Sequence, residues 1–276
     1  MNFCHSFWSK PLFDKKFGDF NNCLYNILLD YAYSVACIHK HGHTITLYAD
    51  SKGIDLLSFI PYDNIVKIDI ESDESKHFAA QIKFKALERM SSQDVLIDGD
   101  IFIETSDIFD LIKVNEPDLM YSFDESNETI FMKSNYDNIR SYYDKLLSKF
   151  NSVDNLHFEV PTIDQLRYPN TSLLKIPNQE LKDDYIKQYF YHKNLLKDID
   201  FENTWPDLLI EQYFIWNYEK DWTIKPLMNK YVASPGYIHL GNAKDIMQSK
   251  IRQKLYFLDK DLMKSTIKKY REMIID

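Results

Sequence analysis

The chain has 276 residues, of which 45% are hydrophobic and 15% aromatic, enough to bury one sizeable core or two closely packed lobes. Lys and Arg number 33 against 42 Asp and Glu, so the formal net charge is −9 at pH 7. A negative charge of this size repels the phosphate backbone and excludes a general nucleic-acid binder.

Strand and helix patterns alternate over the first hundred residues. In chain order the patterns predict a strand at 3–8, a helix at 24–38, a strand at 44–50, a short helix at 54–59, a strand at 64–70, a helix at 74–90 and a strand at 95–97. Strands and helices that alternate with short connections form a mainly parallel sheet covered by helices on both faces. The predicted class is therefore α/β.

The alternation weakens after Glu104. Helical patterns return at 136–150, 181–196 and 206–218, and a strand is predicted within 222–228. Residues 151–170 have loop composition, either throughout or with one strand, residues 234–244 have loop composition, and a Lys-rich helical tail begins near 243. Pro206 suits the first turn of its helix. The second half therefore predicts a more helical structure than the first.

The cysteines and the apolar runs indicate the compartment. Cys4, Cys23 and Cys37 are odd in number and lack metal-ligand spacing, which favours a reduced, cytoplasmic setting. No run approaches the roughly 18 apolar residues that a transmembrane helix needs, and the N-terminus lacks the pattern of a signal peptide. We expect a protein without a transmembrane segment.

An Asp-x-Asp pair is a common pattern, and the chain has three of them. The pairs at Asp198–Asp200 and Asp259–Asp261 lie in polar segments and are explained by solvation. Only Asp98 and Asp100, separated by Gly99, follow a predicted central strand, at the sheet edge where open α/β folds bind ligands. Two carboxylates at this position suit a hard divalent cation that also binds phosphate oxygens.

Four motifs in order resemble the retaining glycosyltransferases of family 8, which have the GT-A fold. They are "IDGD" (Ile97–Asp100), "YPNTSLL" (Tyr168–Leu174), "EQ" (Glu211 and Gln212) and "HLGNAK" (His239–Lys244). The last motif matches the family's H-x-G-x-x-K at each fixed position. The resemblance covers most of the chain and implies a mixed, mainly parallel GT-A sheet flanked by helices, with a helical C-terminal portion.

The resemblance implies a metal site and a diphosphate site. Asp98, Asp100 and His239 would bind Mn²⁺, or Mg²⁺, which bridges the diphosphate of a nucleotide sugar. Lys244 would pair with that diphosphate, and Gly241 would let the loop backbone approach it. A divalent cation and an ammonium together neutralise the charge of a diphosphate leaving group.

The resemblance also implies sugar-binding and catalytic residues. Gln212 or Glu211 would stabilise positive charge on the donor sugar, and Asn170 and Thr171 would contact sugar. The chain departs from the family in having Ser172 where Asn-x-Gly ends, Glu211 in place of Asp, and no Pro-Trp after the final lysine. These departures indicate a divergent, bacterial relative.

Two further residues have two interpretations each. Lys83 aligns approximately with a basic residue that the family places near the donor sugar, or it is an exposed helical lysine. Asp50 contacts the nucleoside, or it caps the helix that follows it.

The resemblance and the residues together predict a hexosyltransferase-like enzyme of the cytoplasm that transfers sugar from a UDP-sugar to a saccharide, a lipid-linked acceptor or another hydroxyl. We expect one domain over 1–276, with a nucleotide-sugar-binding half at 1–104, an acceptor-side half at 105–245 and a tail at 246–276. The basic tail either lies on an anionic membrane or is a solvated helix face. The alternatives are a non-catalytic GT-A-like module that binds nucleotide sugar or glycan, and a nucleotidyltransferase.

Overall fold

The computed structural model describes nine stretches of the chain, and the statements below concern these alone. They are residues 1–14, 19–70, 78–114, 117–124, 145–157, 169–199, 206–228, 236–240 and 244–275. The strands are β1 (Asn2–Phe7), β2 (Thr44–Ala49), β3 (Asn64–Lys67), β4 (Val95–Ile97), β5 (Ile101–Ile103), β6 (Leu119–Asp124), β7 (Pro169–Lys175), β8 (Ile224–Met228) and β9 (Tyr237–His239).

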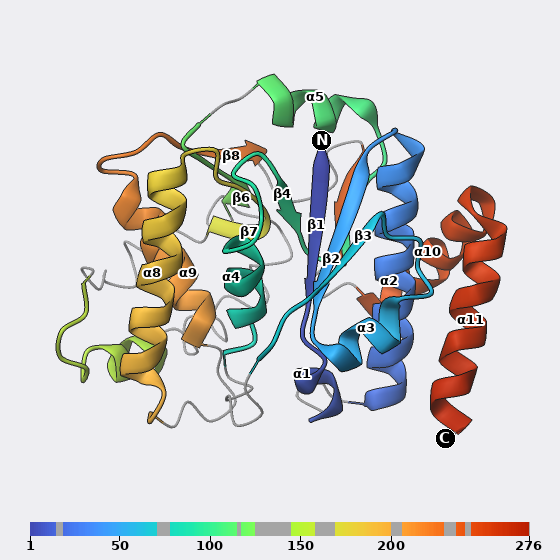
Figure 1. The fold of residues 1–276 in the computed structure, drawn as a ribbon, viewed down its shortest axis with the longest axis horizontal. Coiled ribbons are helices and arrows are strands. Elements are labelled where there is room, and N and C mark those ends of the chain that lie inside the picture. The colour runs from blue at the N-terminus through green and yellow to red at the C-terminus, as the bar shows by residue number, and fades with distance from the viewer. Residues whose placement is uncertain are drawn as a thin grey trace.

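The helices lie on both sides of these strands (Figure 1). They are α1 (Lys10–Phe13), α2 (Phe20–Lys40), α3 (Ser51–Leu57), α4 (Gln81–Leu87), α5 (Ser106–Val114), α8 (Gln179–Leu196), α9 (Pro206–Tyr218), α10 (Lys244–Leu258) and α11 (Lys260–Ile275). Side-chain caps begin four of the described helices, because Asp19, Asp50, Asn178 and Asp259 each accept a hydrogen bond from a backbone N–H in the first turn of the helix.

The main sheet has seven strands in the order β3-β2-β1-β4-β7-β6-β8. Strands β3, β2, β1 and β4 are parallel, β7 is antiparallel to both β4 and β6, and β8 is parallel to β6. The prediction of a mixed, mainly parallel sheet flanked by helices is confirmed. A separate two-stranded sheet pairs β5 with β9 in antiparallel orientation.

Two apolar clusters cover the two faces of the main sheet. Phe3, Leu47 and Ile97 face the cluster that includes α2, α10 and α11, whereas Cys4 and Leu96 face the cluster that includes α4 and α8. Successive residues of a strand point to opposite faces, so a strand with helices on both sides is apolar throughout. Burial of the whole β4 sequence, Val95 to Ile97, follows from this position.

Several predicted elements differ from the structure. The helix predicted at 74–90 is α-helical only at α4, because residues 79–80 and 88–90 form turns or a bend, and 74–77 lie outside the described residues. The helix predicted at 136–150 is described only at 145–150, where it is helical. The prediction that residues 234–244 form a loop is wrong in part, because this range contains β9. The helical tail is two helices, since Asp259 ends α10 and its side chain accepts a hydrogen bond from Leu262 N of α11. No helix of the described chain is long and apolar enough to cross a membrane.

A buried histidine predicts how stability depends on pH. His5 of β1 is fully buried between Tyr62 Oη, 2.9 Å from Nδ1, and Ser34 Oγ, 3.1 Å from Nε2. Burial lowers the pKa of His5 from 6.5 to about 3, although the charge of Asp100 acts in the opposite direction. The folded protein therefore holds His5 neutral at a pH where the unfolded chain binds a proton.

The stabilising effect of neutral His5 is fully present above pH 6.5 and is lost as the pH falls from 6.5 towards 3. We expect His5 to lower the free energy of unfolding by about 3 kcal/mol between pH 7 and pH 4. Urea unfolding of His5→Gln should show a shallower acid slope than the wild type. An unchanged slope in His5→Gln would contradict the assignment.

Candidate active site

The small sheet of β5 and β9 brings the two most distant motifs together. Its register places His239 opposite Ile101, the residue after Asp100. Leu240 N donates to Asp100 O at 3.2 Å, and His239 Nε2 lies 3.8 Å from Asp100 Oδ2. Residues separated by more than half of the chain therefore form one side of a single site.

A tight turn joins β4 to β5 and carries the aspartates. Asp98 N donates to Ser172 O of β7 at 2.7 Å, and Ile101 N donates to Asp98 O at 3.1 Å, which closes the turn. Gly99 is required here because a Cβ atom would lie 2.1 Å from the ring of Tyr31. The glycine thus permits close packing against α2, and not only the approach of a ligand.

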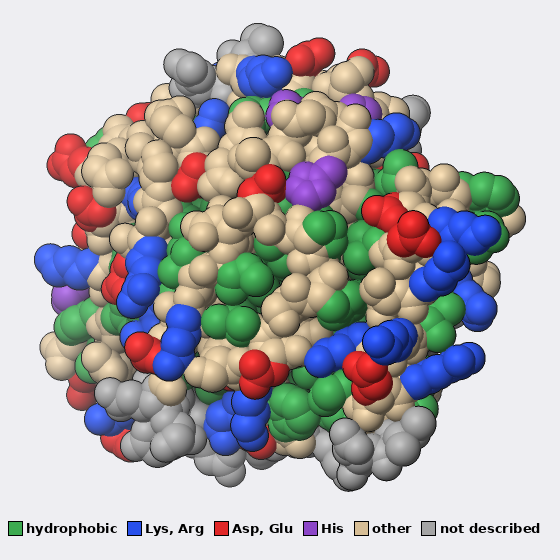
Figure 2. All heavy atoms as spheres, turned by 45° about the vertical axis from the view of Figure 1, so that its right-hand side comes forward, with side chains coloured by type: hydrophobic (Ala, Val, Ile, Leu, Met, Phe, Trp, Pro, Cys, Tyr) green, Lys and Arg blue, Asp and Glu red, His purple; other side chains and the backbone are tan. Residues whose placement is uncertain are grey.

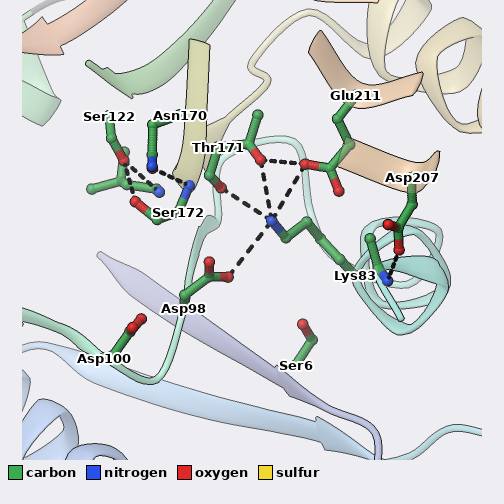
Figure 3. A network of polar contacts seen from close by, with 12 residues as sticks. Ser6, Lys83, Asp98, Asp100, Ser122, Asn170, Thr171, Ser172, Asp207 and Glu211 are labelled. Atoms are coloured by element: carbon green, nitrogen blue, oxygen red, sulfur yellow. Dashed lines mark hydrogen bonds and ion pairs between the residues drawn. The ribbon is translucent and has the colours of Figure 1, made fainter. Parts of the chain in front are cut away.

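Lys83 of α4 is the centre of a buried polar network (Figure 3). Its Nζ donates to Thr171 Oγ1 at 3.2 Å and to Thr171 O at 3.3 Å. The same Nζ lies 3.6 Å from Asp98 Oδ1 and 3.6 Å from Glu211 Oε2. Figure 3 shows the two carboxylates on opposite sides of the ammonium group. The interpretation of Lys83 as an exposed helical lysine is wrong, because its side chain is only 10% exposed.

The network keeps Lys83 charged. Burial alone would lower the pKa of Lys83, but the carboxylates of Asp98, Glu211 and Asp207 raise it above its usual value. A buried ammonium that retains its proton needs such partners. The side chain therefore places a fixed positive charge beside the Asp98 turn.

Asp98 is in contact with other charged groups and with solvent. Burial raises the pKa of Asp98, Asp100 adds to this effect, and Lys83 opposes it. Even so, 39% of the Asp98 side chain is accessible to water. Asp98 is thus available to a ligand from the solvent side.

Glu211 of α9 has one carboxylate oxygen in the network and one outside it. Oε2 accepts a short hydrogen bond from Thr171 Oγ1 and faces Lys83. Oε1 is buried and has no hydrogen-bond partner among the described residues. A buried acceptor without a donor is unfavourable, so Oε1 can accept a hydrogen bond from a bound ligand.

The first turn of α9 also orients α4. Asp207, one helical turn before Glu211, accepts a hydrogen bond from Ala80 N at 2.6 Å, and Ala80 is the N-cap residue of α4. This contact fixes the start of the helix that carries Lys83. The motifs did not predict Asp207, although its position four residues before Glu211 places both on one face of a helix.

Three hydroxyl groups near the turn were not predicted either. Ser122 Oγ lies 2.8 Å from Ser172 Oγ, and Tyr237 Oη donates to Ser122 Oγ at 3.0 Å. These contacts connect β6, β7 and β9, and they hold β9 beside the main sheet. Neither their sequence spacing nor their residue types indicate such a contact.

The remaining predicted residues differ in how well the structure describes them. Asp50 caps α3 through Gly53 N and accepts from Ser9 N and Ser9 Oγ, which confirms the capping interpretation; a nucleoside contact stays a prediction. Asn170 Oδ1 accepts from Ser172 N at 3.0 Å and shapes the start of β7. Gly241 lies outside the described residues, and the side chains of Gln212 and Lys244 are not described.

The donor set fits a divalent cation in part. Asp100 and His239 are neighbouring ligands of suitable type, whereas Asp98 Oδ1 faces Lys83. Within the described stretches no three Asp, Glu, His or Cys side chains are already grouped to hold an ion. A cation at this position would therefore lie beside Asp100 and His239, and Asp98 would be shared between the cation and Lys83.

The fold and the site define an α/β protein with a carboxylate, lysine and histidine site at the end of a central strand. The chain belongs to the family described as a family of unknown function (DUF6734), whose profile matches residues 1–269. No curated protein matches the chain.

Among solved structures, the chain is similar to two of the galactosyltransferase LgtC. The complex with donor and acceptor sugar analogues is 12% identical with a TM-score of 0.44, over 77% of this chain and 70% of that one. An active-site mutant of LgtC is 10% identical with a TM-score of 0.44, over 85% of this chain and 81% of that one. The sheet order and the site contacts described above stand independently of this similarity.

Proposed function

We propose that the chain is a metal-dependent glycosyltransferase that transfers a sugar from a nucleotide sugar, most simply a UDP-sugar, to a hydroxyl acceptor. The observation that carries the proposal is the meeting of the Asp98–Asp100 turn with His239, beside the buried Lys83 and Glu211. The four motifs support it, because Asp98, Thr171 and Glu211 all lie beside Lys83, and His239 lies beside Asp100.

Each residue has a role that its contacts support. Asp100 and His239, with Asp98 shared between the cation and Lys83, would hold a divalent cation, which when bound neutralises charge on a diphosphate. Lys83 supplies a positive charge that does not depend on an ion.

Glu211 would act on the sugar. Its Oε1 can accept a hydrogen bond from a sugar hydroxyl, and its negative charge stabilises positive charge that develops on the donor sugar. Thr171 holds the other oxygen, Oε2, so the carboxylate is already oriented before a ligand binds. Gln212, Asn170, Lys244 and Gly241 keep the roles that the family resemblance implies, and retention of configuration rests on that resemblance as well.

Turnover of UDP-sugars with Mn²⁺ tests the proposal, with UDP release as the readout. We expect release from at least one UDP-sugar, and a loss of about 100-fold in Glu211→Gln with UDP binding retained. Lys187→Glu, an exposed change on α8, serves as the control and should keep wild-type turnover. UDP binding without turnover of any sugar would instead support a non-catalytic binding module, and turnover unaffected by Glu211→Gln would remove Glu211 from the mechanism.

A further inference from the structure

The C-terminal helices differ in charge from the rest of the chain. Residues 244–275 contain nine Lys and Arg against four Asp and Glu, a net charge of +5, whereas the whole chain carries −9. Figure 2 shows Lys and Arg side chains gathered with hydrophobic ones on the side of the molecule where α10 and α11 lie. Positive charge is therefore concentrated on one helical hairpin of an acidic protein.

Large aromatic side chains protrude at the bend of this hairpin. Phe257 is 77% exposed and Tyr256 is 45% exposed, just before α10 ends. They border a groove between the two helices, whose lining also includes Arg252, Met263, Lys264 and Ile267. Exposed apolar groups that cluster in this way mark an interaction surface.

Several basic side chains of the hairpin have no carboxylate partner among the described residues. Within the described chain, Lys264 pairs with Asp261 and Lys268 pairs with Glu272. No carboxylate partner is described for Lys250, Arg252, Lys260 or Arg271, all of which are exposed. Lys260 Nζ lies 5.4 Å from the centre of the Tyr256 ring, so charge and aromatic surface are adjacent. We call these four basic residues with Tyr256 and Phe257 the hairpin patch.

The two helices that carry the hairpin patch are packed against the core of the protein. On the opposite side of the hairpin, Ile251, Leu255 and Leu262 are buried in the core cluster that contains α2. Lys254 of α10 also donates to Glu104 Oε1 at 2.5 Å, four residues after Asp100. The patch is therefore exposed because the other face of the hairpin is already packed, and its position relative to the active-site turn is fixed.

We propose that the hairpin patch docks on an anionic lipid bilayer, with Phe257 and Tyr256 inserted among the headgroups and the basic side chains on the lipid phosphates. Aromatic rings with basic neighbours on a helical surface suit the bilayer interface. A second copy of the chain is a poor occupant, because two patches would bring like charges together. This inference goes beyond the proposed function and does not rest on it.

Vesicle flotation tests the docking. We expect the wild-type protein to float with vesicles of phosphatidylcholine and phosphatidylglycerol but not with phosphatidylcholine alone, and binding should fall about tenfold between about 0.1 M and 0.5 M salt. The double variant Arg252→Glu/Lys260→Glu should lose binding by at least about tenfold, and Phe257→Ser by about threefold or more. Circular dichroism establishes that each variant is folded.

Matched controls separate the patch from general charge and hydrophobicity. Lys187→Glu on α8 reverses a charge outside the patch, and Leu111→Ser on α5 removes an apolar side chain that is 41% exposed. Both should bind like the wild type. Equal binding to neutral and anionic vesicles, equal binding of all variants, or a dimer in sedimentation velocity that Phe257→Ser dissolves would each overturn the proposal.

Discussion

Replacing Lys83 by Met should destabilise the protein by about 3 kcal/mol, because Glu211 would remain buried without a counter-charge. The Glu211 side chain is 3% exposed in the folded protein, whereas the Asp98 side chain is 39% exposed. The loss should therefore come mainly from Glu211. Urea unfolding at pH 7 measures it, and the same variant should bind UDP more weakly than the wild type.

A double-mutant cycle shows whether the Lys83–Glu211 pair is responsible. Glu211→Gln in the Lys83→Met background removes the unpaired negative charge of Glu211, so the double variant should regain most of the lost stability. Lys85→Met is the matched control, since Lys85 lies on the same helix, is only partly buried and contacts the Phe190 ring. A loss in Lys83→Met no greater than in Lys85→Met would contradict the account of the network.

The parallel half of the sheet could be predicted because each element has a local signal. Alternating or fully apolar strands, a long periodic helix at α2 and short connections predict β1 to β4, and the position of Asp98 follows from the end of β4. In each case the sequence pattern lies within the element itself and does not depend on the strand with which that element pairs.

The pairing of β5 with β9 could not be predicted, because each strand has three residues and β9 lies in a segment with turn composition. Only the family resemblance places His239 near Asp100. The ladder between Ile101 and His239 supplies the physical reason, and it depends on tertiary contacts such as that from Tyr237 to Ser122.

Burial of Lys83 had one signal in the sequence. It lies four residues before the buried Leu87, and therefore on a face of α4 that packs inward. A lysine at such a position needs carboxylate partners, but nothing in the spacing identifies Asp98 and Glu211 as those partners. The network is a property of three elements that meet only in the folded chain.

Asp100→Ala and His239→Ala should each remove the metal-dependent part of nucleotide binding. Asp100 and His239 are the two donors already beside each other, so loss of either leaves a cation with too few protein ligands. We expect UDP affinity with Mn²⁺ to fall at least about tenfold in either variant, as is usual when a metal ligand or its support is lost. Calorimetric titration of UDP measures this in the purified protein.

That titration is the most direct test of the proposed site, performed with Mn²⁺ and with chelator on the wild type, both variants and Asp261→Ala. Asp261 belongs to the solvated Asp259–Asp261 pair and is a matched control for Asp100. The account predicts tight binding only with Mn²⁺, retained in Asp261→Ala and lost in Asp100→Ala and His239→Ala. Binding that is equal with metal and with chelator, or absent from the wild type, would contradict a metal-dependent nucleotide-sugar site at the Asp98–Asp100 turn.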